Sequence, residues 1–214
     1  MENHKIIPLT PDSEITMQLG EIFQMSAEDV LNLSEGIMHL KNNDTITLEQ
    51  GHIGLLFSGA LQTFTLYNDP ATGKQEKQIH CLICNDLFHM LCPVVYNNQH
   101  IRNLVEGKIE FDESECPLIQ ATTDSVIVML DLSQIYTNEA VTKFINFYYR
   151  QYPFYTEKID AVKSIPGISE RMQKIKEFFP SLVQYYSHKT IAGFFAINYD
   201  SWKKHSKDIF PKKD

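Results

Sequence analysis

The feature that most constrains the fold is a change in hydrophobic periodicity near residue 132. Between residues 41 and 132, short apolar segments alternate with polar residues and are separated by turn residues, as in 61–67 followed by 68–73. From residue 133 onward, apolar residues recur every three or four positions, which is the spacing of one helix face. The first pattern predicts an antiparallel sandwich or roll and the second predicts packed helices. We therefore expect an α+β protein.

Five segments carry the strand pattern: 45–48, 53–57, 61–67, 77–83 and 125–131. Residues 17–39 are predicted to be helical, because Ser26 and Asp29 have capping-box spacing ahead of an apolar run. The polar stretch 98–115 is predicted to be a long loop.

A long apolar helix is predicted after residue 133. Its helical repeat consists of Ile135, Ala140, Val141, Phe144, Ile145 and Tyr148. Pro153 is expected to break or kink this helix, because proline removes a backbone hydrogen bond. A further helix is expected to open at Ser169, with Met172, Ile175 and Phe179 inward, and to stop at Pro180.

Residues 187–207 predict two short helices joined by a tight turn. The Ser187 hydroxyl can cap the first helix and Asn198 the second, because both side chains accept from orphan backbone N–H groups. The first helix turns Ile191, Ala192 and Phe195 to one face, and the second carries Trp202 inward. This arrangement is typical of a DNA-binding helix-turn-helix.

The distribution of charge agrees with that interpretation at the C-terminal end. The whole chain has a formal net charge of -8, whereas residues 186–214 hold six lysines and three acidic residues. That segment is the part best suited to a phosphate backbone. The N-terminus shows no signal peptide, no apolar run reaches 18 residues, and the four cysteines fit a reducing compartment. We expect a cytoplasmic protein with no membrane segment.

Several motifs, in this order, resemble the cyclic-AMP receptor / fumarate–nitrate regulator (Crp/Fnr) superfamily of bacterial transcription factors. KNNDTITLEQG at 41–51 resembles the family's first strand and glycine turn, and FSGAL at 57–61 resembles the strand-turn-strand that follows. SERMQKIKEFFP at 169–180 and TIAGFFAINYDS at 190–201 resemble the helix before the DNA reader and the reader itself. The resemblance covers residues 20–209.

The resemblance implies a division into three parts. Residues 1–132 would form a β-roll sensor domain with a cyclic-nucleotide-binding-like jelly roll, 133–165 a connector and dimerisation helix, and 166–214 the helix-turn-helix. It also implies a homodimer through 133–165 that binds pseudo-palindromic double-stranded DNA, with RNA polymerase a further candidate partner. By analogy with the family's docking, bases and phosphates would be contacted by Lys189, Tyr199, Asp200, Ser201, Lys203, Lys204 and Lys207.

The predicted effector loop departs from the family. CNDLFH at 84–89 stands where the family has a Pro-Gly-Asp-x-x-Gly loop, and the phosphate-binding Arg-Ser position falls near Glu115 and Cys116. A desolvated glutamate would repel a phosphate, although Arg102 or Lys108 are candidates to replace the arginine. The resemblance places an effector pocket at Asp86, His89, Met90 and Cys116, but the residues argue against a cyclic nucleotide; another small-molecule effector stays open.

The cysteines allow two interpretations. C-x2-C at Cys81 and Cys84, with Cys92 and Cys116, has a spacing used for zinc or iron–sulfur ligands. However, residues three apart on a strand face opposite sides, so the sequence favours buried structural thiols and no metal. It contains none of the local motifs of nucleophilic or metal hydrolases, and we do not expect an enzyme.

Two main functions remain open, and a redox or metal sensor on the same scaffold is a weaker third. The first is a dimeric transcription regulator in which a signal at the roll re-aims the two reading helices. The second is a regulatory ligand- or protein-binding module on the same fold, without sequence-specific DNA reading. The second is motivated by the net charge of -8, by Ala196 in place of the family's turn glycine, and by Lys204 in place of a base-reading arginine.

Overall fold

The computed structural model describes residues 5–48, 52–70, 72–84, 90–91, 118–131 and 138–210. Within these residues, antiparallel strands form one sheet in the order β1-β2-β9-β4-β7 and another in the order β3-β8-β5-β6. The strands are β1 (Ile6–Ile7), β2 (Ser34–Leu40), β3 (Thr45–Ile46), β4 (His52–Ser58), β5 (Leu61–Asn68), β6 (Gln75–Ile83), β7 (Met90–Leu91), β8 (Leu118–Ala121) and β9 (Ser125–Asp131). The predicted antiparallel roll is confirmed.

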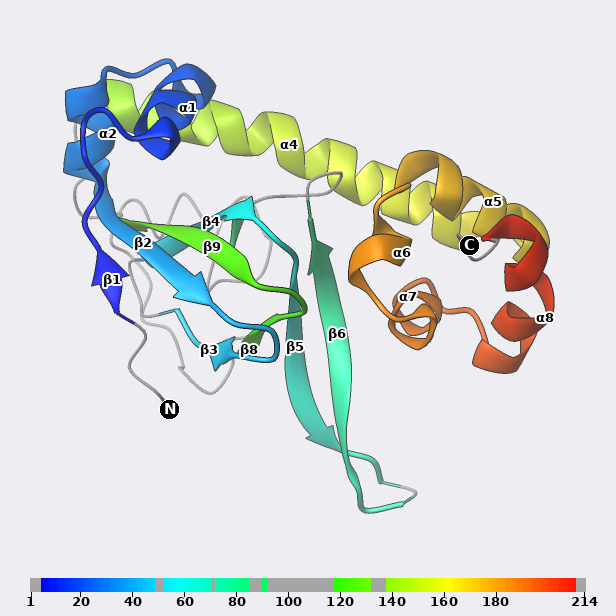
Figure 1. Cartoon of the computed structure of the whole chain (residues 1–214). Helices are drawn as coiled ribbons and strands as arrows, with labels where there is room; N and C mark the ends of the chain where they lie inside the picture. The colour runs from blue at the N-terminus through cyan, green and yellow to red at the C-terminus, as the bar shows by residue number, and fades with distance from the viewer. Residues whose placement is uncertain are drawn as a thin grey trace.

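Helices lie before and after the roll. They are α1 (Glu14–Phe23), α2 (Ala27–Leu33), α4 (Asn138–Ser164), α5 (Ile168–Phe178), α6 (Leu182–Tyr185), α7 (His188–Phe194) and α8 (Tyr199–Ile209). The long helix α4 runs over the roll from α1 and α2 at one end to the group α5–α8 at the other (Figure 1). The predicted α+β order is confirmed.

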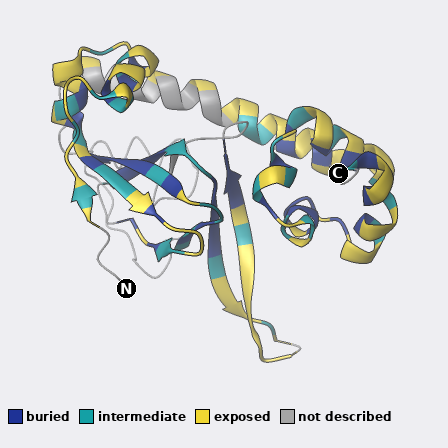
Figure 2. Cartoon of the chain, viewed as in Figure 1, coloured by how far each residue is buried: buried dark blue, intermediate teal, exposed yellow. Residues whose placement is uncertain are grey.

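The hairpin β5–β6 extends away from the roll (Figure 1). Its predicted loop is present: the Asp69 N–H donates to the Lys74 carbonyl over 2.9 Å, and Gly73 closes the turn at φ 66°. The strand ends near the loop are exposed, whereas the ends nearest the helices are buried (Figure 2). The inner end of the hairpin therefore lies where the roll meets the C-terminal helices.

The helix predicted over 17–39 is wrong at 34–39, and what precedes is two helices, α1 and α2, rather than one. Residues 27–33 do form a helix, with the capping box between Ser26 and Asp29 in place. Residues 34–40, however, form β2, which pairs with β9 in the roll. At Gly36 the backbone adopts φ 134° against the Ile7 carbonyl, where a Cβ would collide with backbone. Pairing with strands distant in sequence thus overrides the local helical pattern.

The break predicted at Pro153 does not occur. The structure shows one continuous helix over Asn138–Ser164 with Pro153 inside it. The proline is exposed, so water can satisfy the carbonyl that loses its N–H donor one turn earlier. Of the predicted apolar repeat, Ile135 lies outside the described residues.

Among the described residues, two clusters of buried side chains connect the helices and strands. One lies between the two sheets and includes Leu61, Ile83 and Ile127. The other joins Leu82 and Cys84 of the roll to α4, α5, α7 and α8. Because the second cluster spans both regions, the C-terminal helices are packed onto the roll.

Candidate nucleic-acid interface

The helices α7 and α8 begin at the two caps expected from the sequence. The Ser187 hydroxyl accepts from the Thr190 N–H over 3.0 Å. The Asn198 side chain accepts from the N–H groups of Asp200 and Ser201 over 2.9 and 3.3 Å. Each cap satisfies backbone donors that the first helical turn leaves unpaired. Both caps are local interactions, which explains why the sequence predicts them.

The turn between α7 and α8 places Ala196 in the left-handed region, at φ 54°. This conformation is costly for a residue with a Cβ. The turn is closed by the Ile197 N–H, which donates to the Ala192 carbonyl over 2.8 Å. Arg171 of α5 stabilises this turn, because its guanidinium donates to the carbonyls of Phe195 and Ala196, each over 3.3 Å. No local pattern in the sequence indicates this role for Arg171.

Trp202 fixes the inner face of α8. Its side chain is completely buried and stacks on Phe210, with ring centroids 5.5 Å apart and planes 10° from parallel. The His188 ring of α7 lies on it at 5.7 Å. The predicted inward position of Trp202 is confirmed, and the opposite face of α8 is left to solvent.

The outer face of α8 carries Lys203, Lys204 and Lys207, all exposed, around one shallow depression that Asp200 also lines. We call these four residues the α8 basic face. Lys203 pairs with Asp200 at 2.7 Å and its ammonium lies 5.0 Å from the Tyr199 ring centroid. The Lys203 hydrogen bond lowers the pKa of Asp200, and Asp200 in turn raises the pKa of Lys203. In the described part of the chain, Lys204 and Lys207 form no ion pair.

The remaining predicted contact residues lie around this face. Tyr199 is 38% exposed at the start of α8, and Ser201 is half-buried one turn from the cap. Lys189 is exposed on α7 and does not line the depression. The structure thus gathers Asp200, Lys203, Lys204 and Lys207 on one surface; contact of any of these residues with DNA stays a prediction.

A buried tyrosine connects this helical region to the roll. The Tyr186 hydroxyl accepts from the Ile83 N–H over 2.9 Å and lies 2.7 Å from the Leu61 carbonyl and 2.8 Å from the Ile83 carbonyl. Leu61 and Ile83 are partners at the inner end of the β5–β6 hairpin. Burial raises the pKa of Tyr186 well above its usual value, so the hydroxyl stays protonated and can donate. We call this set of hydrogen bonds the Tyr186 junction.

The fold of this chain recurs in solved structures. A CRP-family transcriptional regulator from Thermus thermophilus has a TM-score of 0.52 and 16% identity, covering 79% of this chain and 82% of its own. A Crp/Fnr-family regulator from Eubacterium rectale has a TM-score of 0.55 and 12% identity, covering 91% and 87%. The chain has the Crp/Fnr fold.

A cyclic nucleotide-binding domain containing protein from Listeria monocytogenes EGD-e shares this Crp/Fnr fold, with a TM-score of 0.55 and 10% identity over 92% of this chain and 90% of its own. No family model matches the sequence, and no curated protein is similar to it. In addition, no helix in the described residues is long and apolar enough to cross a membrane. The resemblance found in the motifs is therefore supported by structure rather than by sequence similarity.

The predicted effector pocket of this Crp/Fnr fold falls mostly outside the described residues. Asp86, His89 and Cys116 lie outside them, as do Glu115 and the loop predicted over 98–115. Met90 begins β7, where it pairs with Leu55 of β4. The effector pocket therefore stays a prediction.

Cys81 and Cys84 are both buried, in line with the structural interpretation; Cys92 and Cys116 lie outside the described residues. The two described cysteines pack in different clusters, Cys81 between the sheets and Cys84 toward the helices. Burial raises the pKa of the Cys81 thiol to about 12, and its sulfur lies 2.9 Å from the Tyr155 hydroxyl. A neutral thiol in this position contributes packing and hydrogen bonds with the Tyr155 hydroxyl and the Leu82 carbonyl.

Replacing Ala196 by glycine is expected to stabilise the protein by about 0.5–1 kcal/mol. Glycine adopts the left-handed conformation of the turn without the Cβ penalty, although it loses more entropy on folding. Urea unfolding measures the change. Gly193→Ala is the control with the opposite substitution. Gly193 lies within α7, where a Cβ meets open space, so alanine rather than glycine should be the more stable residue there. A loss of stability in Ala196→Gly would contradict the strain at this turn.

Proposed function

We propose that this protein is a homodimeric DNA-binding transcription regulator of the Crp/Fnr type that acts in the cytoplasm. The observation that carries the proposal is the α8 basic face on a capped helix, which Trp202 fixes from behind. A rigid helix with lysines on its outer side suits the major groove of DNA. Contacts to the flanking phosphates position the protein, and contacts to base edges in the groove specify the site. The Crp/Fnr fold of the whole chain supports the same function.

The dimer would form along α4. Phe154 is 66% exposed on this helix, and a large exposed aromatic side chain on a long helix suits helix–helix association. Two-fold symmetry would set two α8 helices about one DNA turn apart, on a pseudo-palindromic site. We retain the three-part division at residues 132 and 165 as a proposal, with a roll that senses something other than a cyclic nucleotide.

The proposal is tested by selecting DNA from a random pool with the purified protein. Enrichment of a pseudo-palindrome by a dimer, confirmed by sedimentation of the free protein and of the complex, is the expected result. A folded dimer that enriches no sequence, either alone or with cell extract metabolites added, would overturn it.

Replacing Lys204 and Lys207 together by glutamine is expected to weaken DNA binding and its dependence on salt. Each phosphate contact adds about 0.9 to the slope of log affinity against log salt concentration, so losing the two Lys207 contacts of a dimer lowers the slope by about 2. Losing Lys204, which is expected to face the bases, lowers the affinity further. Fluorescence anisotropy at several salt concentrations measures it. The double variant Lys5→Gln, Lys74→Gln removes the same charge at exposed positions away from α4 and α8 and should keep the original slope.

A second function keeps some support. Asp200 lies on the α8 basic face and neutralises Lys203, and the chain as a whole carries a net charge of -8. Both features suit a regulatory module that binds a protein or ligand without reading DNA sequence. Such a module would show almost no salt-dependent affinity for DNA, which separates it from the proposed regulator in the same titration.

A further inference from the structure

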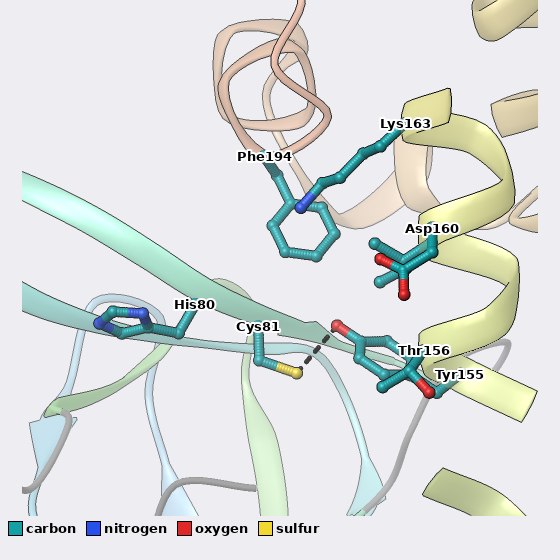
Figure 3. A pocket seen from close by; sticks show the side chains of 8 residues that line it. His80, Cys81, Tyr155, Thr156, Asp160, Lys163 and Phe194 are labelled. Carbon is teal, nitrogen blue, oxygen red and sulfur yellow. Dashed lines mark hydrogen bonds between the residues drawn. The ribbon is translucent and has the colours of Figure 1, made fainter. Parts of the chain in front are cut away.

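We propose that a cleft where β6, α4 and α7 meet binds a free α-amino acid, as a second effector site distinct from the predicted pocket at Asp86 and His89. The cleft has a volume of about 150 Å³. It is shown in Figure 3 and called the junction cleft below. A cavity of this size accommodates a molecule about as large as benzene, which suits a ligand of few non-hydrogen atoms.

The floor of the junction cleft is apolar and its mouth is charged. Cys81, Ile159 and Phe194 line it and are buried. His80, Asp160 and Lys163 line its exposed mouth (Figure 3). Small-molecule sites commonly combine an apolar wall with a few polar groups that fix the orientation of the ligand.

The two charges at the mouth are available to a ligand. Asp160 and Lys163 are three residues apart on α4, a spacing at which carboxylate and ammonium often pair. Here Lys163 instead lies over the Phe194 ring, with its nitrogen 4.9 Å from the centroid. Within the described residues neither side chain forms an ion pair.

The charge pattern selects a zwitterion. Desolvation lowers the pKa of His80, so at neutral pH the mouth carries one negative and one positive charge and no net charge. A ligand ammonium would approach Asp160 and a ligand carboxylate Lys163, while a small side chain would rest on Phe194 and Ile159. A free amine or a free carboxylic acid would leave one of the two protein charges without a partner.

A ligand in this position would contact three parts of the molecule at once. His80 and Cys81 belong to the roll, Asp160 and Lys163 to the long helix, and Phe194 to the helix before α8. Binding would therefore favour the arrangement in which these parts are packed as seen here. This step rests on the proposed function, whereas binding itself does not.

The test uses the full-length protein without DNA. Isothermal titration calorimetry with alanine, serine and valine measures binding, and NMR of labelled Phe194 and Ile159 locates it. Two valine relatives complete the set: valinamide, which lacks the carboxylate, and isovalerate, which lacks the amine. At least one of the amino acids should bind and shift the Phe194 and Ile159 signals, and valine, if it binds, should bind more tightly than both of its relatives.

Substitutions at the mouth of the junction cleft test which charged side chains bind the ligand. Asp160→Asn and Lys163→Met should each weaken binding about tenfold or more, because each removes a charge-assisted hydrogen bond. Glu157→Gln and Lys158→Gln, neighbours on α4 that do not line the cleft, should leave the affinity unchanged. The proposal is overturned if no amino acid binds, if valinamide or isovalerate binds as well as valine, or if both mouth variants bind like the original protein. Because DNA is absent, these outcomes are independent of the proposed function.

Discussion

Replacing Trp202 by alanine is expected to lower the free energy of unfolding by about 3–5 kcal/mol, the range for removing a buried aromatic side chain. Trp202 is completely buried, and its loss would leave a void beside Phe210 and His188, whose rings contact it and each other. Urea unfolding followed by circular dichroism measures the change. DNA affinity should fall at the same time, because α8 would lose the contact that fixes its orientation.

Trp202→Phe is the matched control for this prediction. Within the described residues, the Trp202 indole nitrogen is buried without a hydrogen-bond partner. Phenylalanine keeps much of the ring packing and leaves no unpaired donor, so its cost should be well below that of alanine. A loss below about 1 kcal/mol in Trp202→Ala would contradict the anchoring role of this side chain.

Replacing Tyr186 by phenylalanine is expected to cost about 1–3 kcal/mol, the penalty for leaving a buried polar group unsatisfied. The variant removes one oxygen, but the Ile83 N–H loses its acceptor and the carbonyls of Leu61 and Ile83 lose their shared donor. Equilibrium unfolding measures the stability. Hydrogen exchange should show faster exchange of the Ile83 amide than in the original protein.

The neighbouring tyrosine supplies the control for the Tyr186 junction. Tyr185 is only partly buried and packs at the edge of the same cluster, so Tyr185→Phe should leave the exchange of the Ile83 amide unchanged.

The contribution of Tyr186 to stability is expected to depend on pH. Because the pKa of Tyr186 is raised in the folded state, its contribution is present below the unfolded pKa of about 10 and is lost as the pH rises above it. The stability difference between the original protein and Tyr186→Phe should therefore shrink in alkaline solution.

What the sequence predicted correctly was local. The caps at Ser187 and Asn198 each satisfy N–H groups two or three residues away, and the strands 61–67 and 77–83 carry their own alternation. The inward position of Trp202 follows from helical spacing. These features depend on residues that are close together in the sequence, so the spacing of residue types is enough to predict them.

What the sequence missed depends on distant contacts. The strand at 34–40 forms because β9 supplies a partner, and its residues alone extend the preceding helical pattern. Arg171 supports the turn at Ala196, 25 residues later, and Tyr186 reaches Ile83 across 103 residues. The junction cleft combines side chains from three elements, so no single segment contains a motif for it.

Because α4 is continuous through Pro153, its length determines how far a movement at the roll can displace the C-terminal helices. A helix of 27 residues is about 40 Å long. If it moves as one rod, a tilt of about 10° at the roll displaces its far end by about 7 Å, which is close to two base-pair steps of DNA at ~3.4 Å each. A kinked helix would absorb such a tilt at its bend. In the proposed regulator, α4 moving as one rod would deliver a small movement at the sheet as a displacement large enough to take a bound helix out of register with its DNA site.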